Sequence, residues 1–189
     1  MKRYAVSLVL FGVLGASAWA PAPPSPVHAV DQQSTGITTP DFVEGCPVGA
    51  ERAQVFTAGR TGVLDQVSLV ATRDPGNRPT LQVNIYTVAD NRPTANLIGG
   101  GSYNGPGSAD NQTFTDIPLS APASVTQGQQ YVLVFTAPSP CTGGRWEIWG
   151  NFASVDTYDR GFALYHYWNP YWETYDPFFM DFAFKTWVI

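Results

Sequence analysis

Cysteine, histidine and charged side chains are all scarce in this sequence, and these shortages exclude several kinds of chemistry. Its 189 residues include two cysteines, two histidines and only 13% charged residues. A zinc site needs three or four clustered ligands, and a lone Cys pair with a distant His does not make one. The alternation of residues 162–167 places His166 on the same strand face as Phe162 and Leu164, so we expect it to be packed rather than catalytic. With no Gly-x-Ser-x-Gly motif either, Ser/His and Cys/His hydrolysis are excluded.

Positive charge and helix-forming residues are also in short supply. The chain holds 10 Lys and Arg against 15 Asp and Glu, and Lys185 is the only lysine after Lys2. Such an acidic protein repels phosphate backbones, so nucleic acid is excluded as a partner. No window repeats Ala, Leu, Glu and Lys with a period of 3.6 residues, so long helices are not expected.

The N-terminus has the pattern of a secretory signal. Lys2 and Arg3 precede an apolar run, Ala5–Ala18, which is too short to cross a bilayer. Cleavage after Ala20 or Ala29 would fit the small-residue rule, and Pro21 disfavours the first site. A retained membrane anchor is the alternative, but the run ends in Gly, Ala and Ser rather than a stop-transfer sequence. We expect residues 1–29 to be removed and the chain to be secreted, either into the medium or to the cell envelope, with no membrane segment left.

Removing the signal leaves two cysteines in an oxidising compartment. An even number of cysteines there is most simply explained by a disulfide, Cys46–Cys141. It would close a loop of about 95 residues, for which chain entropy predicts about 4–5 kcal/mol of stabilisation. The pairing requires the start of the domain to lie beside the end of the strand expected over residues 131–136. Residues 30–45 are polar and unpatterned, so we predict a flexible leader there and one folded domain over residues 46–189.

The folded part reads as a series of short strands. Leu81, Val83 and Ile85 alternate with Gln82, Asn84 and Tyr86, so the first three should face inward and the others outward. Residues 131–135 are apolar at consecutive positions, as in a central strand covered on both faces. The inward parity breaks at residues 65–66, which predicts either a bulge or the start of a strand there. Residues 97–103 resemble an edge strand with a glycine bulge.

Eight or nine such strands, without crossover helices, cannot build a parallel sheet. The sequence therefore predicts an all-β fold, an antiparallel two-sheet jelly roll or β-sandwich. The sequence has no internal repeat, which argues against a propeller or solenoid.

Aromatic residues are concentrated at the C-terminus, where residues 162–189 hold 12 of the 26 Phe, Trp and Tyr residues. Two prolines interrupt the stretch between the strands expected there, which indicates a loop. Sugar recognition combines aromatic faces with planar polar side chains. The candidate ligand-binding residues are Trp146, Trp149, Asn151, Arg160, Trp168, Asn169, Tyr171, Trp172, Glu173 and Tyr175. Two other interpretations stay open: the rings cover the end of the sandwich, or they dock another protein.

Acidic residues offer two weaker hypotheses. Asp156 and Asp159 are the best candidates for a structural Ca²⁺ site, although turn chemistry explains them without a metal. Asp156 with Asp159, or Glu173 with Asp176, could flank a glycosidic bond as a carboxylate pair. Acidic residues are spread too thinly for this to be favoured, so a glycosidase is a distant alternative. No other cofactor is expected.

Several short motifs resemble those of a bacterial exported β-sandwich module. They are Phe-Thr-x-Gly at residues 56–59, Leu-x-x-Val-x-Leu at 64–69, Tyr-x-Arg-Gly at 158–161 and Asp-x-Ala-Phe at 181–184. The resemblance covers about residues 50–188 and implies a jelly roll similar to galactose-binding domains. It carries no catalytic residue set. We therefore expect a secreted, non-catalytic module that binds glycan or cell-wall polysaccharide, with a structural or protein-interaction module as the main alternative.

Overall fold

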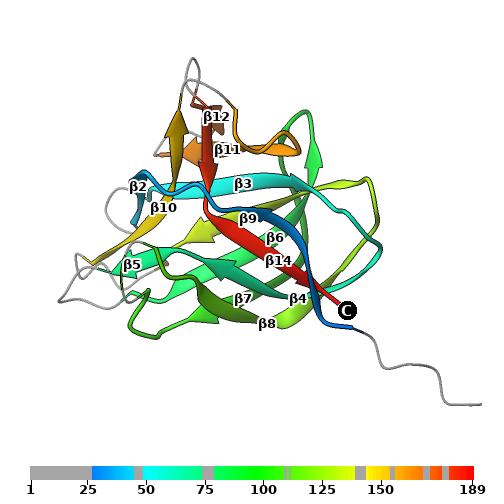
Figure 1. Ribbon diagram of the computed structural model, residues 1–189. Helices are drawn as coiled ribbons and strands as arrows, with labels where there is room; N and C mark the ends of the chain where they lie inside the picture. Colours follow the sequence, from blue (N-terminus) through cyan, green and yellow to red (C-terminus); the bar gives the residue numbers. More distant parts are fainter. Residues whose placement is uncertain are drawn as a thin grey trace, which may run out of the picture.

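The computed structural model describes residues 27–44, 49–73, 79–108, 110, 112–138, 144–153, 156–167, 171–175 and 179–189. Within these ranges every regular element is a strand, and the pairings between neighbouring strands are antiparallel (Figure 1). They form a large curled sheet and a smaller one, so the prediction of an all-β, two-sheet sandwich is confirmed. The described part of the chain holds no helix with the length and apolar character needed to cross a bilayer.

The large sheet has ten strands. In order across the sheet they are β1 (Ala29–Ser34), β14 (Phe184–Val188), β4 (Gly62–Leu69), β8 (Thr115–Val125), β7 (Arg92–Tyr103), β6 (Leu81–Ala89), β9 (Gln130–Thr136), β3 (Glu51–Thr57), β11 (Gly161–His166) and β12 (Glu173–Thr174).

The small sheet is built around β10. Its strands are β13 (Phe179–Phe182), β10 (Arg145–Ala153) and β2 (Thr39–Glu44), with β5 (Ala71–Arg73) also paired to β10. Two segments pass from one sheet to the other, β4–β5 at Val70 and β13–β14 at Ala183. The backbone of Trp149 contacts both of these crossing points. Its N–H donates to the Val70 carbonyl at 2.9 Å, and its carbonyl accepts from the Ala183 N–H at 2.8 Å. Strands that switch sheets close the corners of a sandwich in this way.

The described residues contain fourteen strands rather than the eight or nine expected. Part of the difference comes from short strands that lack a full alternating pattern, such as β5 and β12. The rest comes from the predicted closing strand, which the structure divides into β13 and β14, and from β1 and β2, which lie almost entirely in the segment predicted to be a flexible leader. That prediction is wrong for residues 30–44, because β1 pairs with β14 along the edge of the large sheet and β2 pairs with β10.

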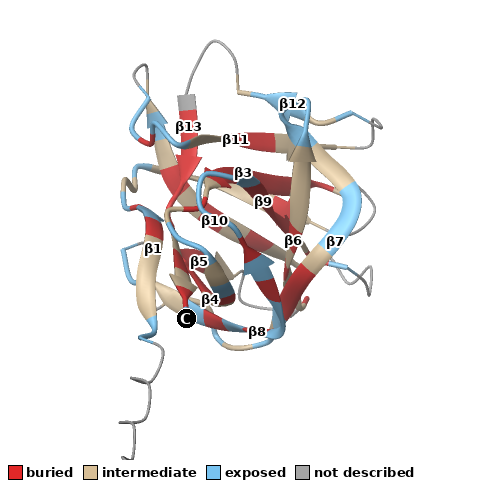
Figure 2. Cartoon of the chain, turned by 90° about the vertical axis from the view of Figure 1, so that its right-hand side faces the viewer, coloured by how far each residue is buried: buried red, intermediate tan, exposed pale blue. Residues whose placement is uncertain are grey.

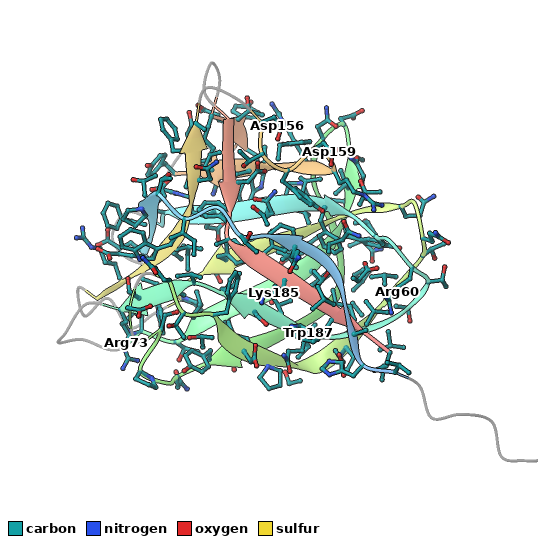
Figure 3. The ribbon with its side chains drawn as sticks, in the orientation of Figure 1. Arg60, Arg73, Asp156, Asp159, Lys185 and Trp187 are labelled. Carbon is teal, nitrogen blue, oxygen red and sulfur yellow. The ribbon has the colours of Figure 1, made fainter. Side chains whose placement is uncertain are left out.

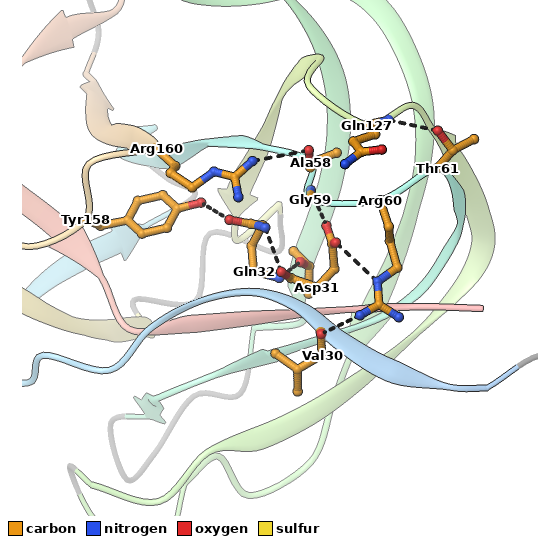
Figure 4. Close-up of polar contacts among 11 residues, drawn as sticks. Val30, Asp31, Gln32, Ala58, Gly59, Arg60, Thr61, Gln127, Tyr158 and Arg160 are labelled. Atoms are coloured by element: carbon orange, nitrogen blue, oxygen red, sulfur yellow. Dashed lines mark hydrogen bonds and ion pairs between the residues drawn. The ribbon is translucent and has the colours of Figure 1, made fainter.

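Two polar side chains of β1, Asp31 and Gln32, find partners in the sandwich (Figure 4). Asp31 accepts a hydrogen bond from the Gly59 N–H at 3.0 Å and lies 3.5 Å from the Arg60 guanidinium. Gln32 is buried, accepts from the Tyr158 hydroxyl at 3.1 Å, and donates through its backbone to Thr186 at 3.0 Å. A polar sequence therefore does not make this segment a solvated leader.

The main core fills the space between the two sheets. Phe135 of β9 packs edge-on against Phe182 of β13, with ring centroids 5.6 Å apart, and Tyr158 packs in the same way on Phe184 at 5.2 Å. A second, smaller cluster lies on the opposite face of β3, β9 and β11 and contains Ala53, Val55, Val132, Val134 and Leu164. Residues of β9 alternate between the two clusters, which confirms the prediction of a central strand covered on both faces.

Two predicted irregularities can be compared with the observed register. The β4–β8 register shifts between Leu64 and Gln66, inside β4, which confirms a bulge there rather than the start of a strand. Residues 97–103 belong to β7, whose register with β6 is also irregular. However, β7 lies between β6 and β8 and is not an edge strand. A Cβ at Gly99 or Gly101 would come within 2.7 Å of β8 atoms, so these glycines allow the two strands to approach closely.

Cys46 and Cys141 lie outside the described residues, so their disulfide stays a prediction. The described residues that flank them are neighbours: Glu44 pairs with Arg145, and Arg52 pairs with Phe135. The start of the domain thus lies beside the end of β9, as the predicted pairing requires.

Candidate binding site

The two tryptophans of β10 lie on opposite faces of the strand, and only Trp146 is buried. Trp146 has no exposed surface, and its indole N–H donates to the Pro79 carbonyl at 2.9 Å. The prediction that Trp146 contacts a ligand is therefore wrong, because the ring fills the core between the sheets. Trp149 points to the other face of β10, where its indole N–H donates to the Thr72 hydroxyl at 2.9 Å.

Tyr175 also points into the protein, towards a buried ion pair. Its hydroxyl donates to Asp41, whose carboxylate holds the buried Arg52 through contacts of 2.6 and 2.7 Å. Burial raises the pKa of Tyr175, and the neighbouring Asp41 carboxylate adds to the effect. The Tyr167 hydroxyl completes the group by accepting from Arg52 at 2.8 Å. These contacts fix the C-terminal aromatic segment on β2 and β3, so they stabilise the fold.

The predicted polar residues do not converge on one place. Asn151 donates to the Thr157 hydroxyl at 3.0 Å, and Arg160 donates to the Ala58 carbonyl at 3.4 Å near β1 (Figure 4). Glu173 lies on β12 and accepts from the Tyr165 hydroxyl at 2.7 Å.

The candidate calcium residues, Asp156 and Asp159, are exposed beside each other at one end of the molecule (Figure 3). The carboxylate of Asp156 accepts from the Tyr158 N–H at 2.9 Å, which is ordinary turn chemistry. No group of three or more His, Cys, Asp or Glu side chains suited to a metal is found in the described ranges. The structure therefore adds no support for calcium at Asp156 and Asp159.

Two of the predicted aromatic residues border cavities: Tyr175 borders one of about 210 Å³ together with Asp41 and Phe152, and Trp172 borders a larger one. The Trp172 ring lies 5.2 Å from the His166 imidazole and packs against the second apolar cluster. His166 shares the outer face of β11 with Phe162 and Leu164, as predicted, and its Nδ1 lies 3.2 Å from Glu51 Oε2 on the neighbouring strand. Tyr171 is 63% exposed and does not line this cavity. Trp168 and Asn169 lie outside the described residues.

A second cavity on the outer face of the large sheet shares lining residues with the cavity beside Trp172. The first, of about 420 Å³, is lined by Glu51, Gln82, Asn84, Tyr86, Pro93, Thr94, Val134, Thr136 and Trp172. The second, of about 440 Å³, is lined by Gln82, Asn84, Leu97, Ile98, Gly99, Gly100, Gly101, Ser102, Ser120 and Ala121. Because both include Gln82 and Asn84, we treat them as one feature, the outer groove.

Strand alternation explains the middle of the outer groove. Val83 and Ile85 enter the main core, so Gln82, Asn84 and Tyr86 must face the other side of β6, as the sequence predicts. Gly100 keeps the adjacent surface low: a Cβ there would lie 2.8 Å from Asn84 Oδ1. Figure 2 shows β12 beyond the upper ends of β6 and β7, which places the Trp172 segment at one end of the outer groove.

The lining combines amides, hydroxyls and aromatic rings. Gln82 and Asn84 each carry a planar donor–acceptor group, and Ser102, Ser120, Thr94 and Thr136 add hydroxyls. Among the described lining residues, Glu51 is the only charged one. Burial raises its pKa, while the adjacent His166 opposes that shift. Such a surface suits a polar, uncharged ligand with apolar C–H faces.

Sequence reasoning singled out Trp172 but missed the rest of the outer groove. One signal was present: an alternating strand that presents Gln82, Asn84 and Tyr86 outward, followed by Gly99–Gly101. It was not decisive, because outward polar residues are also what an ordinary solvated strand face presents.

The chain matches no protein-family model and no curated protein sequence. The resemblance to an exported β-sandwich module therefore stays a prediction.

Proposed function

We propose that the protein is an exported, non-catalytic binding module that takes a polysaccharide along the outer groove. The observation that carries this proposal is the groove itself, in which amide groups on β6 lie between a tryptophan at one end and a glycine floor at the other. Export is proposed from the N-terminal signal pattern. The proposal moves the predicted site from the aromatic loop to the sheet face and keeps Trp172 as the shared residue.

The groove fits a sugar chain in both chemistry and extent. Pyranose rings offer C–H faces that stack on Trp172 and Tyr86, and hydroxyls that pair with Gln82 and Asn84. Each of the two cavities, of about 440 and 420 Å³, is open to solvent and falls within the size range of ordinary ligand sites. A site that continues across several strands favours a chain of sugar units over a single small molecule.

A protein-interaction module is the alternative, and exposed aromatic residues favour it. Tyr171 and Phe152 are 63% and 42% exposed, and neither lines the outer groove. Aromatic residues of this kind are enriched at protein interfaces.

Binding of soluble polysaccharides to the mature protein, followed by affinity electrophoresis and calorimetry, tests the proposal. We expect Trp172→Ala and Asn84→Ala each to weaken binding about tenfold, equivalent to about 1.4 kcal/mol. Tyr171→Ala is the matched control, since it removes a neighbouring aromatic ring outside the groove, and it should change affinity less than twofold. Loss of binding in Tyr171→Ala with Trp172→Ala unchanged would place the site on the loop instead. If no polysaccharide binds the wild-type protein, the proposed function is wrong.

A further inference from the structure

We infer that the Trp172 end of the outer groove selects a protonated amino sugar, so that the preferred ligand is a polysaccharide with free amino groups. This inference rests on the proposed function and specifies its substrate class. It depends on three residues that face one cavity, Glu51, Tyr86 and Trp172, and on the position of His166 behind them.

Charge in the groove has one sign. Among the described residues that line the two cavities, Glu51 is the only Asp, Glu, Lys, Arg or His. A polymer of uronic acids or phosphates would bring negative charge to a site with no described cation in its lining. The acidic balance of the whole chain, with 15 Asp and Glu against 10 Lys and Arg, repels such polymers further. An ammonium group instead gains a favourable Coulomb interaction.

Glu51 is held in place rather than left as a solvated surface charge. Its strand neighbour across the β3–β11 ladder is His166, whose Nδ1 lies 3.2 Å from Glu51 Oε2. A carboxylate accepts several hydrogen bonds, so this contact leaves acceptor capacity for an ammonium donor. The Glu51 side chain is 35% exposed, which allows a ligand to reach it from the groove.

The aromatic residues supply the second half of an ammonium site. Trp172 presents its ring beside His166 at 5.2 Å, and Tyr86 lines the same cavity from β6. A cation over the face of Trp or Tyr is stabilised by the ring quadrupole, while the sugar's C–H face stacks on the same surface. One carboxylate and two rings around a single cavity therefore favour a charged amine on a pyranose over a neutral N-acetyl group.

Two hexasaccharides with the same β-linked backbone test this inference, one of glucosamine and one fully N-acetylated, at a pH chosen so that the amines carry protons and the Glu51 carboxylate is ionised. We expect the wild-type protein to bind the glucosamine hexamer at least tenfold more tightly, with the preference shrinking as salt is raised. Glu51→Gln keeps the shape of the side chain and should remove the preference while still binding the N-acetylated hexamer. Trp172→Ala should weaken binding of both.

The outcomes separate the inference from the proposed function. Equal binding of both hexamers, unchanged by Glu51→Gln, would overturn amine selection and leave polysaccharide binding in place. Failure of both hexamers and of every neutral polysaccharide would overturn the proposed function itself. An oligolysine of similar length is the control, and binding of it without either hexamer would point to a basic peptide and overturn both.

Discussion

Asp181 gives the most direct test of the electrostatics of this fold. It lies on β13, is 2% exposed, and accepts hydrogen bonds from Gln54 Nε2 at 3.1 Å and the Thr157 hydroxyl at 3.5 Å. Burial raises its pKa from 3.8 to about 6, and the nearby Asp156 charge adds to this, while the hydrogen bonds oppose it. The buried carboxylate is thus less stable in the folded protein than in the unfolded chain.

The sign of the pH dependence follows from this shift. Between pH 3.8 and about 6 the folded state binds the Asp181 proton more tightly than the unfolded state does. The stability that this proton provides is complete below pH 3.8 and is lost as the pH rises through 6. At about 1.4 kcal/mol per pKa unit, a shift of about two units corresponds to about 2–3 kcal/mol.

Asp181→Asn removes the titration while keeping the shape. Its amide oxygen accepts from Gln54, and its NH₂ group donates to the Thr157 hydroxyl, so the hydrogen bonds persist. We expect the unfolding free energy of Asp181→Asn minus that of wild type to rise by about 2–3 kcal/mol between pH 4 and pH 7.5.

Urea unfolding followed by tryptophan fluorescence at half-unit pH intervals measures this difference. Other carboxylates titrate in both proteins and cancel in the comparison. Asp159→Asn is the control, since Asp159 is exposed, and it should differ from wild type by less than about 0.5 kcal/mol at every pH. A difference between Asp181→Asn and wild type that stays flat across this range would refute the reasoning.

Three further predictions concern stability. Arg52→Ala leaves the Asp41 carboxylate without its guanidinium partner and should cost about 3–5 kcal/mol in urea unfolding, whereas a surface-type pair would cost less than about 1 kcal/mol. Trp146→Ala empties the core beside β10 and should cost about 3–5 kcal/mol, and a smaller loss would mean that the ring is not packed as described. Intact mass under non-reducing conditions should be about 2 Da below the reduced mass if Cys46 and Cys141 are joined, and replacing both by serine should lower stability by about 4–5 kcal/mol. Free thiols in the exported protein would contradict that pairing.

The fold was largely predictable because its signals are local. Alternation along β6 gives the inward Val83 and Ile85 and the outward Asn84 directly, since a strand has a period of two. The bulge at residues 65–66 is visible as a break in the same alternation. These patterns need no knowledge of which strands are neighbours.

The candidate site was predictable only in part because burial depends on neighbours. Trp146 and Trp172 are equally apolar in the sequence, yet Trp146 has no exposed surface and Trp172 lines a cavity. The polar sequence of β1 indicated a solvated segment, because its hydrogen-bond partners, such as Gly59 and Tyr158, lie more than 25 residues away in the sequence. Residue propensity and composition do not reveal such long-range contacts.

By itself, then, the sequence determined the β class of the protein, the strand faces of β6 and β9, and the acidic charge that disfavours anionic partners. Only the tertiary structure decided which aromatic residues reach the surface and that Glu51, Asn84 and Trp172 line one groove. The physical reason is that these three residues come from β3, β6 and the segment before β12, and long-range strand pairing, which leaves no local pattern, brings them together.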